Sequence, residues 1–476
     1  MTWRAGRVSF DLGQGPMGPP WPNPWPMDPR LLPCALADLP RYTSYPTAVQ
    51  FASDFPAATA NRWLSELTPQ TTLSVYIHIP FCQQLCWYCG CHTSVPNSYD
   101  RAARYVELLC SDIARASRLA GSGRGQLRHL HFGGGTPTYL DDLHIGEILE
   151  AVDKGFGLAG DAEVALESDP RTLTSVRARM LAGMGFNRIS FGVQDFDFGV
   201  QRKINRLQPF SLVAEATEYL RAAGFASINF DLMYGLPGQS VASVTRTAKE
   251  AASLAPDRLA VFGYAHVPWF KKHQKMIADS DLPGVAARYD QARAIAAELA
   301  GAGYVDIGLD HFARADDSLA IAARSGTLRR NFQGYTTDVA GALLSFGASA
   351  ISEFPRGFVQ AARDTLSWSE QVSSDRNPAS RGLHCTPEDR MRAEIIERLM
   401  CDLAVDYAAI AAAHGFPDTV FAGIHERLAA CREAGIAELG EGSVRVPEDS
   451  RLFLRSVAAA FDAHYVAAPN RHAKAV

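Results

Sequence analysis

Between residues 70 and 310 the sequence alternates short apolar runs, rich in β-branched residues, with amphipathic stretches of helical periodicity. Near-continuous apolar strands that are each followed by a helix are typical of a parallel sheet whose faces are covered by helices. Six such units are too few for a closed eight-fold barrel, so we predict an α/β fold with an open, partial (β/α)6 barrel. The expected strands lie at 73–81, 127–135, 162–170, 187–195, 226–235 and 258–268, with helical patterns such as 100–120 and 211–224 between them.

The chain on either side of this region differs in composition. Eight prolines lie between Pro16 and Pro33, and proline removes backbone donors that helices and strands need. We therefore expect an irregular, Pro-rich and flexible N-terminal arm at 1–40. The parts expected after it are an ordered segment at 41–70, the barrel and its extension at 71–355, a polar linker at 356–384, and a mainly helical C-terminal domain at 385–476, which opens with a Thr386-x-x-Asp389 cap.

Charge and hydropathy exclude several classes of protein. The 476 residues include 46 Lys and Arg against 51 Asp and Glu, for a net charge of −5, whereas a nucleic-acid-binding domain is normally basic. No apolar run approaches the ~18 residues of a membrane span, and the first residues show no apolar leader. We expect a cytoplasmic enzyme that binds neither nucleic acid nor membrane.

Polar residues and glycines follow the expected strands at the points where the strands end. In βα barrels the carboxyl ends of the strands assemble the active site. Six strand ends that carry chemistry in register predict one site at this face, although an ordinary salt bridge or cap explains any one of these residues taken alone. In strand order the residues are Cys82, Gly133 to Thr136, Glu167, Gln194, Asp231 and His266.

Four of the nine cysteines fall within ten residues, directly after the first strand. An odd count at low density does not suit a disulfide scaffold. Cys82, Cys86 and Cys89 on one loop are typical ligands of a soft metal or an iron–sulfur cluster. Zinc, which usually takes its ligands from two separated pairs, and unliganded thiols are the alternatives. The fourth thiol, Cys91, either completes the cluster or, because the Cys89-x-Cys91 spacing is tight, has a role other than ligation.

The motif YIHIPFCQQLCWYCGC at 76–91 resembles the signature of radical S-adenosylmethionine enzymes of the oxygen-independent coproporphyrinogen III oxidase type. The resemblance continues from about residue 40 to 355, through RYTSYPT (41–47), HFGGGTPTYL (131–140), ISFGVQDF (189–196), INFDLMYGLPGQ (228–239) and RNFQGYTT (330–337). It implies the partial barrel of the radical S-adenosylmethionine enzymes and a 4Fe–4S cluster held by Cys82, Cys86 and Cys89. The iron without a protein ligand then binds and reduces S-adenosylmethionine.

The resemblance also implies roles for the residues around the cysteine loop. Cys91 is implied to be a catalytic residue that is not a cluster ligand. Two molecules of S-adenosylmethionine are implied. The first contacts Tyr76, Gly134, Glu167 and Ile351, and the second contacts Tyr88, Gly135, Thr136, Gln194, Arg206, Asp231 and Ala265.

The activity that the resemblance implies is the anaerobic oxidative decarboxylation of two propionates of coproporphyrinogen III to vinyl groups. The product is protoporphyrinogen IX, in haem biosynthesis, and a 5′-deoxyadenosyl radical takes a hydrogen from each propionate. The alternatives are a haem chaperone or carrier of the same family, and a related radical enzyme, such as a methyltransferase, acting on another tetrapyrrole or aromatic substrate. Cys91 and RNFQGYTT (330–337) favour the oxidase.

The partners are less constrained by the sequence. We expect a monomer that receives electrons from a donor such as flavodoxin or ferredoxin and releases electrons to an acceptor that the sequence does not identify. Arg41, Arg314 and Arg330 lie inside family-like motifs and are candidates to hold the substrate propionates. Salt bridging or solvation is the alternative for each of them, and the sequence does not rank the three.

Overall fold

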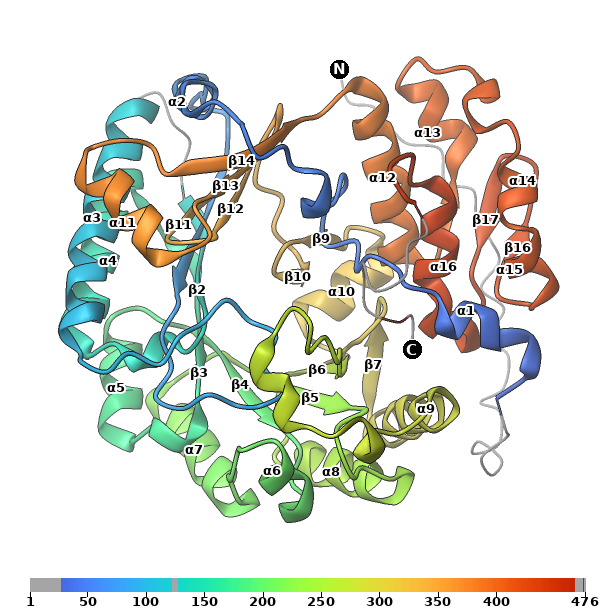
Figure 1. Ribbon diagram of the computed structural model, residues 1–476, viewed down its shortest axis with the longest axis horizontal. Coiled ribbons are helices and arrows are strands. Elements are labelled where there is room, and N and C mark those ends of the chain that lie inside the picture. The colour runs from blue at the N-terminus through green and yellow to red at the C-terminus, as the bar shows by residue number, and fades with distance from the viewer. Residues whose placement is uncertain (1–26, 122–126, 467–473, 475–476) are drawn as a thin grey trace.

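A computed structural model describes residues 27–121, 127–466 and 474 (Figure 1). Most of the strands belong to one twelve-stranded sheet with the order β14-β13-β12-β11-β1-β2-β3-β4-β5-β6-β8-β7. The part of the expected arm at 1–26 lies outside the described residues.

Six parallel strands form the centre of the sheet, and they follow one another in chain order. This confirms the predicted series of βα units. The sheet does not close on itself, because β14 and β7 lie at opposite edges. The six strands are β1 (Leu73–Ile79), β2 (Leu127–Gly134), β3 (Leu158–Ser168), β4 (Arg188–Gln194), β5 (Ser227–Tyr234) and β6 (Arg258–Gly263).

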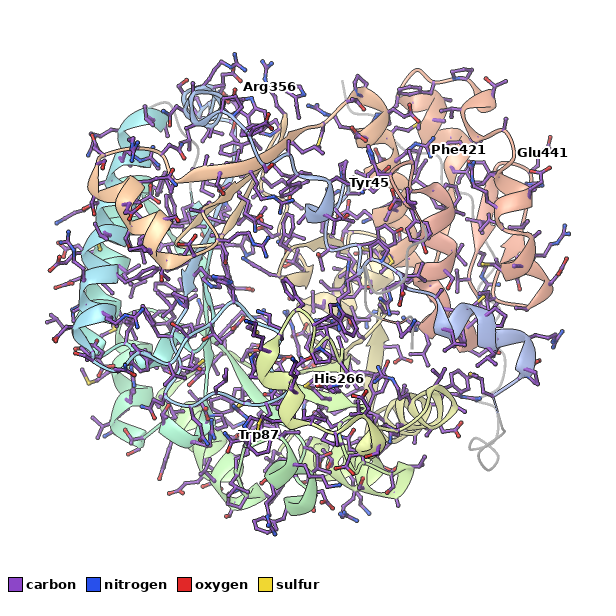
Figure 2. All side chains as sticks on the ribbon, viewed as in Figure 1. Tyr45, Trp87, His266, Arg356, Phe421 and Glu441 are labelled. Atoms are coloured by element: carbon purple, nitrogen blue, oxygen red, sulfur yellow. The ribbon has the colours of Figure 1, made fainter. Side chains whose placement is uncertain are left out.

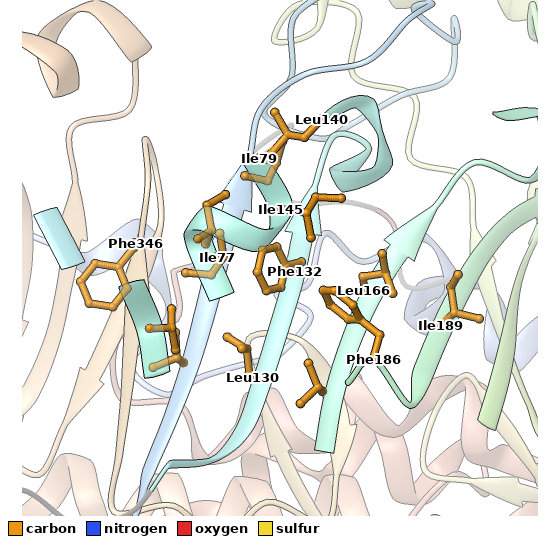
Figure 3. Close-up of a cluster of buried hydrophobic side chains, with 14 of the residues drawn as sticks. Ile77, Ile79, Leu130, Phe132, Leu140, Ile145, Leu166, Phe186, Ile189 and Phe346 are labelled. Atoms are coloured by element: carbon orange, nitrogen blue, oxygen red, sulfur yellow. The ribbon is translucent and has the colours of Figure 1, made fainter. Parts of the chain in front are cut away.

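Helices cover the outer face of these strands, as Figure 1 shows. The core between the layers is apolar, and Figure 3 shows Ile77, Phe132, Leu166 and Ile189, which come from four successive strands and are buried. Burying one such side chain contributes about 1.5–3 kcal/mol. The covering helices are α3 (Asp100–Ala120), α4 (Asp142–Phe156), α5 (Ser175–Gly183), α7 (Phe210–Ala223), α8 (Val241–Ser253) and α9 (Val285–Gly301).

The sheet extends beyond the predicted units at both edges. A seventh parallel strand, β11 (Ala342–Phe346), pairs with β1. It is followed by the antiparallel strands β12 (Ile351–Phe354), β13 (Gly357–Ala361) and β14 (Ala379–His384). At the other edge β8 (His311–Arg314) runs antiparallel to β6 and pairs with β7 (Tyr304–Ile307).

The expected linker at 356–384 is wrong, because this segment forms β13, α11 (Thr365–Ser373) and β14. Two apolar side chains in this otherwise polar segment are buried. Trp368 is fully buried and its ring lies 4.5 Å from that of Tyr105 on α3, and Val372 on the same helix face is also buried. The segment therefore packs against the main core.

The expected flexible arm is wrong for its last residues. After the short η1 (Pro29–Leu31), helix α1 (Leu32–Leu36) buries Cys34 and Ala35 in the core of the C-terminal region. The carbonyl of Leu39 accepts a hydrogen bond from Arg455 Nη1 at 3.1 Å. Proline at the start of a helix leaves no donor unsatisfied, which is why this Pro-rich stretch still folds.

The C-terminal region is mainly helical, as predicted. Helix α12 (Pro387–Asp402) begins with a capping box formed by Thr386 and Asp389. The expected hairpin is β16 (Glu438–Leu439) with β17 (Ser443–Arg445), which also pairs with β15 (Ala404–Asp406). The short helices of this region are α13 (Tyr407–Ala413), α14 (Ile424–Arg427), α15 (Ala429–Glu433) and α16 (Leu454–Ala458). Among the described helices, none has both the length and the apolar character needed to cross a bilayer.

Candidate active site

The cysteine loop leaves the carboxyl end of β1 and is closed at its neck by backbone hydrogen bonds. Cys82 N–H donates to the carbonyl of Ser94 at 3.0 Å, and Ser94 N–H donates to that of Pro80 at 2.8 Å. On its far side the loop is held by Trp87 N–H, which donates to the carbonyl of Ile204 at 3.0 Å. The loop is thus held at its neck and at its far side, which keeps its thiols at the carboxyl edge of the sheet.

Hydrogen-bond donors surround the first two thiols. Cys82 Sγ lies 3.1 Å from Thr93 Oγ1 and 3.5 Å from Thr136 Oγ1, and Arg206 Nη1 lies 3.5 Å from Cys86 Sγ. Burial raises the pKa of Cys82, and the hydrogen bonds with the two threonines partly offset this. Donors of this kind stabilise thiolates and tune the potential of a cluster that the thiolates bind.

Cys89 and Cys91 are in contact through their thiols. The hydrogen bond between them lowers the pKa of Cys89 to about 7 and holds that of Cys91 well above its usual range. Of the four thiols in the loop, Cys91 is the exposed one. The pair therefore consists of one thiol disposed to become a thiolate and one disposed to stay protonated.

The donor set of the loop fits an iron–sulfur cluster better than a single metal ion. Among the described residues, no three His, Cys, Asp or Glu side chains come close enough together to hold one metal ion. A 4Fe–4S cluster instead takes each thiolate on a separate iron. Cys82, Cys86 and Cys89 would hold such a cluster.

Glu167, at the end of β3, organises the glycines that follow β2. Its Oε2 accepts a hydrogen bond from Gly134 N–H at 3.1 Å, and its Oε1 lies 3.4 Å from His131 Nε2. A Cβ at Gly133 would lie 2.8 Å from Glu167 Oε1 and 2.9 Å from Tyr76 Cε2. Glycine is required here because the glycine backbone, the carboxylate and the Tyr76 ring approach too closely for a side chain.

The next two residues pack against the cysteine loop. Gly135 N–H donates to the carbonyl of Ile79, and Thr136 N–H donates to that of Phe81, both at 2.8 Å. A Cβ at Gly135 would lie 2.5 Å from Thr93 Oγ1. The structure thus places Gly135 and Thr136 beside the Cys82 end of the loop.

Gln194 and Arg206 meet over Gly192 in β4. A Cβ at Gly192 would lie 2.7 Å from Gln194 Nε2 and 3.1 Å from Arg206 Nη2. Arg206 Nη2 donates to the Gly192 carbonyl at 2.6 Å, and Arg206 Nη1 lies 3.4 Å from Asp169 Oδ2. Sequence reasoning missed Gly192 and Asp169, although a lone glycine inside a strand is a known signal of close approach.

Asp231, inside β5, faces the same space. Its carboxylate accepts a hydrogen bond from Asn229 Nδ2 at 2.9 Å. Burial, and next the charge of Glu167, raise the pKa of Asp231 to about 7. Glu167 and Asp231 are both half-buried, and two neighbouring carboxylates that repel each other are suited to hydroxyl groups, which donate hydrogen bonds without adding charge.

The last two predicted contacts differ in position. The carbonyl of Ala265, just after β6, accepts a hydrogen bond at 3.3 Å from Gln274 Nε2, which also donates to the carbonyl of Tyr88 at 2.9 Å. Ile351 lies farther out, on β12. Strand β11 lies between β12 and β1, and its Ser345 pairs with Tyr76 of β1 and donates a hydrogen bond to the carbonyl of Ile351. The other predicted residues gather around the cysteine loop.

A large cavity opens beside this site. It has a volume of about 1190 Å³ and lies between the carboxyl end of β6, helix α9 and the segment η8 (Glu448–Phe453). Ala265 and His266 line it together with Arg41 and Arg288. His266 is held on both sides, by Tyr264 Oη at 2.7 Å and Asp279 Oδ1 at 2.9 Å.

Comparison with known proteins defines the class first. Residues 76–251 match the sequence profile of the Radical SAM superfamily. The match begins in β1, spans the cysteine loop and ends in α8, so these elements form a radical S-adenosylmethionine domain.

Longer relatives define the family. The oxygen-independent coproporphyrinogen III oxidase of Bradyrhizobium diazoefficiens is 48% identical over 92% of this chain and 97% of its own length. That of Escherichia coli is 40% identical over 89% of this chain and 93% of its own length. The solved structure of the Escherichia coli coproporphyrinogen III oxidase, 38% identical in that comparison, superposes with a TM-score of 0.85 and covers 90% of this chain and 100% of that one. This chain belongs to the family of oxygen-independent coproporphyrinogen III oxidases.

Proposed function

We propose that this chain catalyses the anaerobic oxidative decarboxylation of two propionates of coproporphyrinogen III to vinyl groups, giving protoporphyrinogen IX for haem biosynthesis. The observation that carries the proposal is the cysteine loop, with its fixed thiols, set beside a cavity of about 1190 Å³ that has arginines on its wall. The names of the relatives support the same reaction.

The cofactors in this proposal are a 4Fe–4S cluster on Cys82, Cys86 and Cys89 and two molecules of S-adenosylmethionine. Bound together, they supply a radical able to remove a hydrogen atom from a propionate. For each propionate one electron enters at the cluster. The propionate loses a hydrogen atom and carbon dioxide, and one electron leaves to an acceptor, so the electrons balance.

The chain's own residues position these groups. Tyr76, Gly134, Glu167 and Ile351 are proposed to contact the first S-adenosylmethionine. The second is proposed to lie against Tyr88, Gly135, Thr136, Gln194, Arg206, Asp231 and Ala265. Arg206 suits a carboxylate because its guanidinium is planar and charged. A binding stoichiometry of one S-adenosylmethionine in the reconstituted wild type would overturn the second site.

The substrate carries four propionates, and several arginines line the cavity, with Arg330 behind Arg41. Arg41 Nη2 donates to the carbonyl of Gly263 at 3.3 Å, and Arg288 Nη1 donates to that of Tyr264 at 2.9 Å. Arg330 Nη2 donates to the carbonyl of Arg41 at 3.2 Å. Burial and, as the largest of the nearby charges, Arg41 lower the pKa of Arg455 to about 10.

This arginine cluster is suited to carboxylates. Nε of Arg288 and Nη1 of Arg330 are buried and have no hydrogen-bond partner within the described part of the chain. Asp310 is one of the acidic residues that line the cavity, and its pKa is lowered to about 2, against the opposing effect of burial, chiefly by its hydrogen bond with His311. A propionate would relieve the repulsion between the arginines and accept charge-assisted hydrogen bonds from them.

The structure also separates the three arginines that the sequence did not rank. Arg41 and Arg330 are joined in the cluster, whereas Arg314 is exposed and pairs with Asp316 at 3.4 Å. The backbone N–H of Arg314 donates to the carbonyl of Asp257, next to the amino end of β6. We therefore propose Arg41 and Arg330 as propionate ligands and not Arg314.

The proposal includes a monomer in the cytoplasm and a small electron-carrier protein, such as flavodoxin or ferredoxin, as the donor. Anaerobic incubation of the reconstituted protein with coproporphyrinogen III, S-adenosylmethionine and dithionite tests it. A product that has lost two carboxyl groups as vinyls supports the proposal. An unchanged substrate with tight haem binding would point to a carrier, and a methylated product to a methyltransferase.

A further inference from the structure

The segment between β6 and α9 carries an exposed apolar patch. It includes η5 (Lys272–Met276) and η6 (Asp279–Asp281). Phe270 is 62% exposed and Met276 60%, and Trp269, which is 57% exposed, also borders the cavity. Figure 1 draws this segment in front of the parallel strands, next to the cysteine loop. Large apolar side chains grouped at the surface mark interaction sites.

Three side chains of this segment bind the backbone of the cysteine loop directly. Lys271 Nζ donates to the carbonyl of Cys91 at 2.8 Å, and His273 Nε2 lies 2.7 Å from that of Cys89. Gln274 Nε2 donates to the carbonyl of Tyr88 at 2.9 Å. The segment that carries the exposed patch is therefore in direct contact with the loop that would hold the cluster.

Packing joins the same two segments. Trp87 of the cysteine loop packs against a buried cluster that includes Tyr264 and Ile277, which lie on either side of the patch. Figure 2 labels Trp87 of the loop and His266 of this segment. The patch and the cysteine loop thus form one rigid surface.

The surface is rich in positive charge although the chain as a whole carries −5. Lys271, Lys272 and Lys275 lie within five residues, and no ion pair is formed by Lys272 or Lys275 among the described residues. Helix α6 (Phe198–Lys203) adds Arg202 and Lys203 and is tied to the segment by an ion pair between Lys203 and Asp281 at 3.1 Å. The apolar patch is thus bordered mostly by cations, with the exposed carboxylate of Asp279, which pairs with His266, as an acidic neighbour.

We propose that this surface, formed by residues 269–276 and the end of α6, docks an acidic one-electron carrier protein that reduces the cluster. The inference rests on the proposed function, because that reaction consumes one electron at the cluster for each propionate. The carrier is oxidised by one electron and the cluster is reduced by one. An apolar centre with a charged rim is the usual anatomy of a transient interface, and complementary charge accelerates the encounter.

Charge reversal at the rim tests the inference. The double variant Lys272→Glu/Lys275→Glu changes two exposed side chains that the site does not use. Its matched control is Arg427→Glu/Arg432→Glu, which makes the same change of charge on α14 and α15, at the right-hand edge of Figure 1. The probes are a purified flavodoxin and, in parallel, a purified ferredoxin.

Two measurements are needed: calorimetric binding of each carrier, and stopped-flow reduction of the oxidised cluster by the reduced carrier. We expect the rim variant to bind at least one carrier about tenfold more weakly at low salt, with slower reduction. The difference should fade at high salt, because exposed charges are then screened. The control should behave as the wild type, and dithionite should reduce all three proteins at the same rate.

A second variant separates the apolar centre from the rim. Phe270→Ala should weaken carrier binding at both low and high salt, since lost apolar contact is not screened. Unchanged binding and reduction of both carriers by both variants would overturn the docking surface. A raised KM for coproporphyrinogen III with dithionite as reductant would also overturn it, in favour of a substrate lid. Absence of dithionite-driven decarboxylation in the wild type would instead overturn the proposed function.

Discussion

At the scale of single residues, the fourth cysteine of the loop, Cys91, interacts directly with Cys89. The hydrogen bond between the two thiols lowers the pKa of Cys89 to about 7 and holds the pKa of Cys91 well above its usual range. The sequence located both residues but left the role of Cys91 open, because spacing alone does not reveal which thiol is deprotonated.

We predict that Cys91→Ser retains the cluster and loses vinyl formation. A serine at this position keeps the size of the side chain and a hydroxyl donor toward Cys89, whereas the thiol is lost. Iron content and the absorption spectrum of the reconstituted variant should equal those of the wild type. Cys82→Ala serves as the comparison and should lose iron. If Cys91→Ser also loses its iron, then Cys91 is a ligand.

A buried carboxyl group makes stability depend on pH. Burial, and next the charge of Glu397, raise the pKa of Glu353 on β12 to about 7. A carboxyl with a raised folded pKa stabilises the fold fully below its unfolded pKa, and this contribution is lost as the pH rises through about 7. The wild type should therefore lose up to about 3 kcal/mol of unfolding free energy between about pH 5 and about pH 8.

Glu353→Gln should reduce this pH dependence, because the amide does not ionise, whereas Asp231, whose pKa is also raised to about 7, still does. Urea unfolding followed by circular dichroism at several pH values measures the effect. Glu370→Gln, an exposed change on α11, is the control and should follow the wild type. An unaltered slope in Glu353→Gln would show that other groups carry the dependence.

At the scale of elements, the repeating βα units were predicted from the sequence, whereas the additional strands at the two edges of the sheet were not. The parallel strands are six to eleven residues long and mostly apolar, as in LSVYIHI of β1, and their alternation with helical patterns is visible without a structure. The short strands β12 to β14 pair antiparallel with one another, and α11, which lies between β13 and β14 in the chain, packs against the distant helix α3 through Trp368 and Tyr105. A polar stretch with a single tryptophan therefore gave no sequence signal for this packing.

Helix α11 provides the test of that packing. Trp368→Ala should lower the free energy of unfolding by about 3–5 kcal/mol, since a large buried side chain is replaced by a cavity. Leu366→Ala on the same helix is the matched control, because Leu366 is 70% exposed and should change stability little. Equal urea midpoints for the two variants would contradict the burial of Trp368.

At the scale of the whole molecule, three distant parts of the chain build one cavity. Arg41 comes from the N-terminal segment, Arg288 from α9 of the barrel and Arg455 from α16 of the C-terminal region. Arg330 joins them from β9 (Arg329–Asn331), which pairs with β10 (Gly334–Thr336). The motifs RYTSYPT and RNFQGYTT were visible in the sequence, but only the fold shows that they meet.

We predict that Arg41→Gln raises the KM for coproporphyrinogen III about tenfold or more, since a charge-assisted hydrogen bond is worth ~1.5–3 kcal/mol. Arg41 lines the cavity without touching the cysteine loop, so cleavage of S-adenosylmethionine in the absence of substrate should be unchanged. Arg314→Gln, at the other end of β6, is the control. Equal KM values for the two variants would remove the arginine cluster from substrate binding.

The most direct test of the central claim uses coproporphyrinogen III deuterated at the carbon of each propionate that bears the abstracted hydrogen. The reconstituted protein is incubated with it anaerobically, together with S-adenosylmethionine and dithionite, and both products are analysed by mass spectrometry. We predict protoporphyrinogen IX together with 5′-deoxyadenosine that carries one deuterium, one molecule for each vinyl group formed. Vinyl groups accompanied by unlabelled 5′-deoxyadenosine, or labelled substrate recovered intact, would contradict the account.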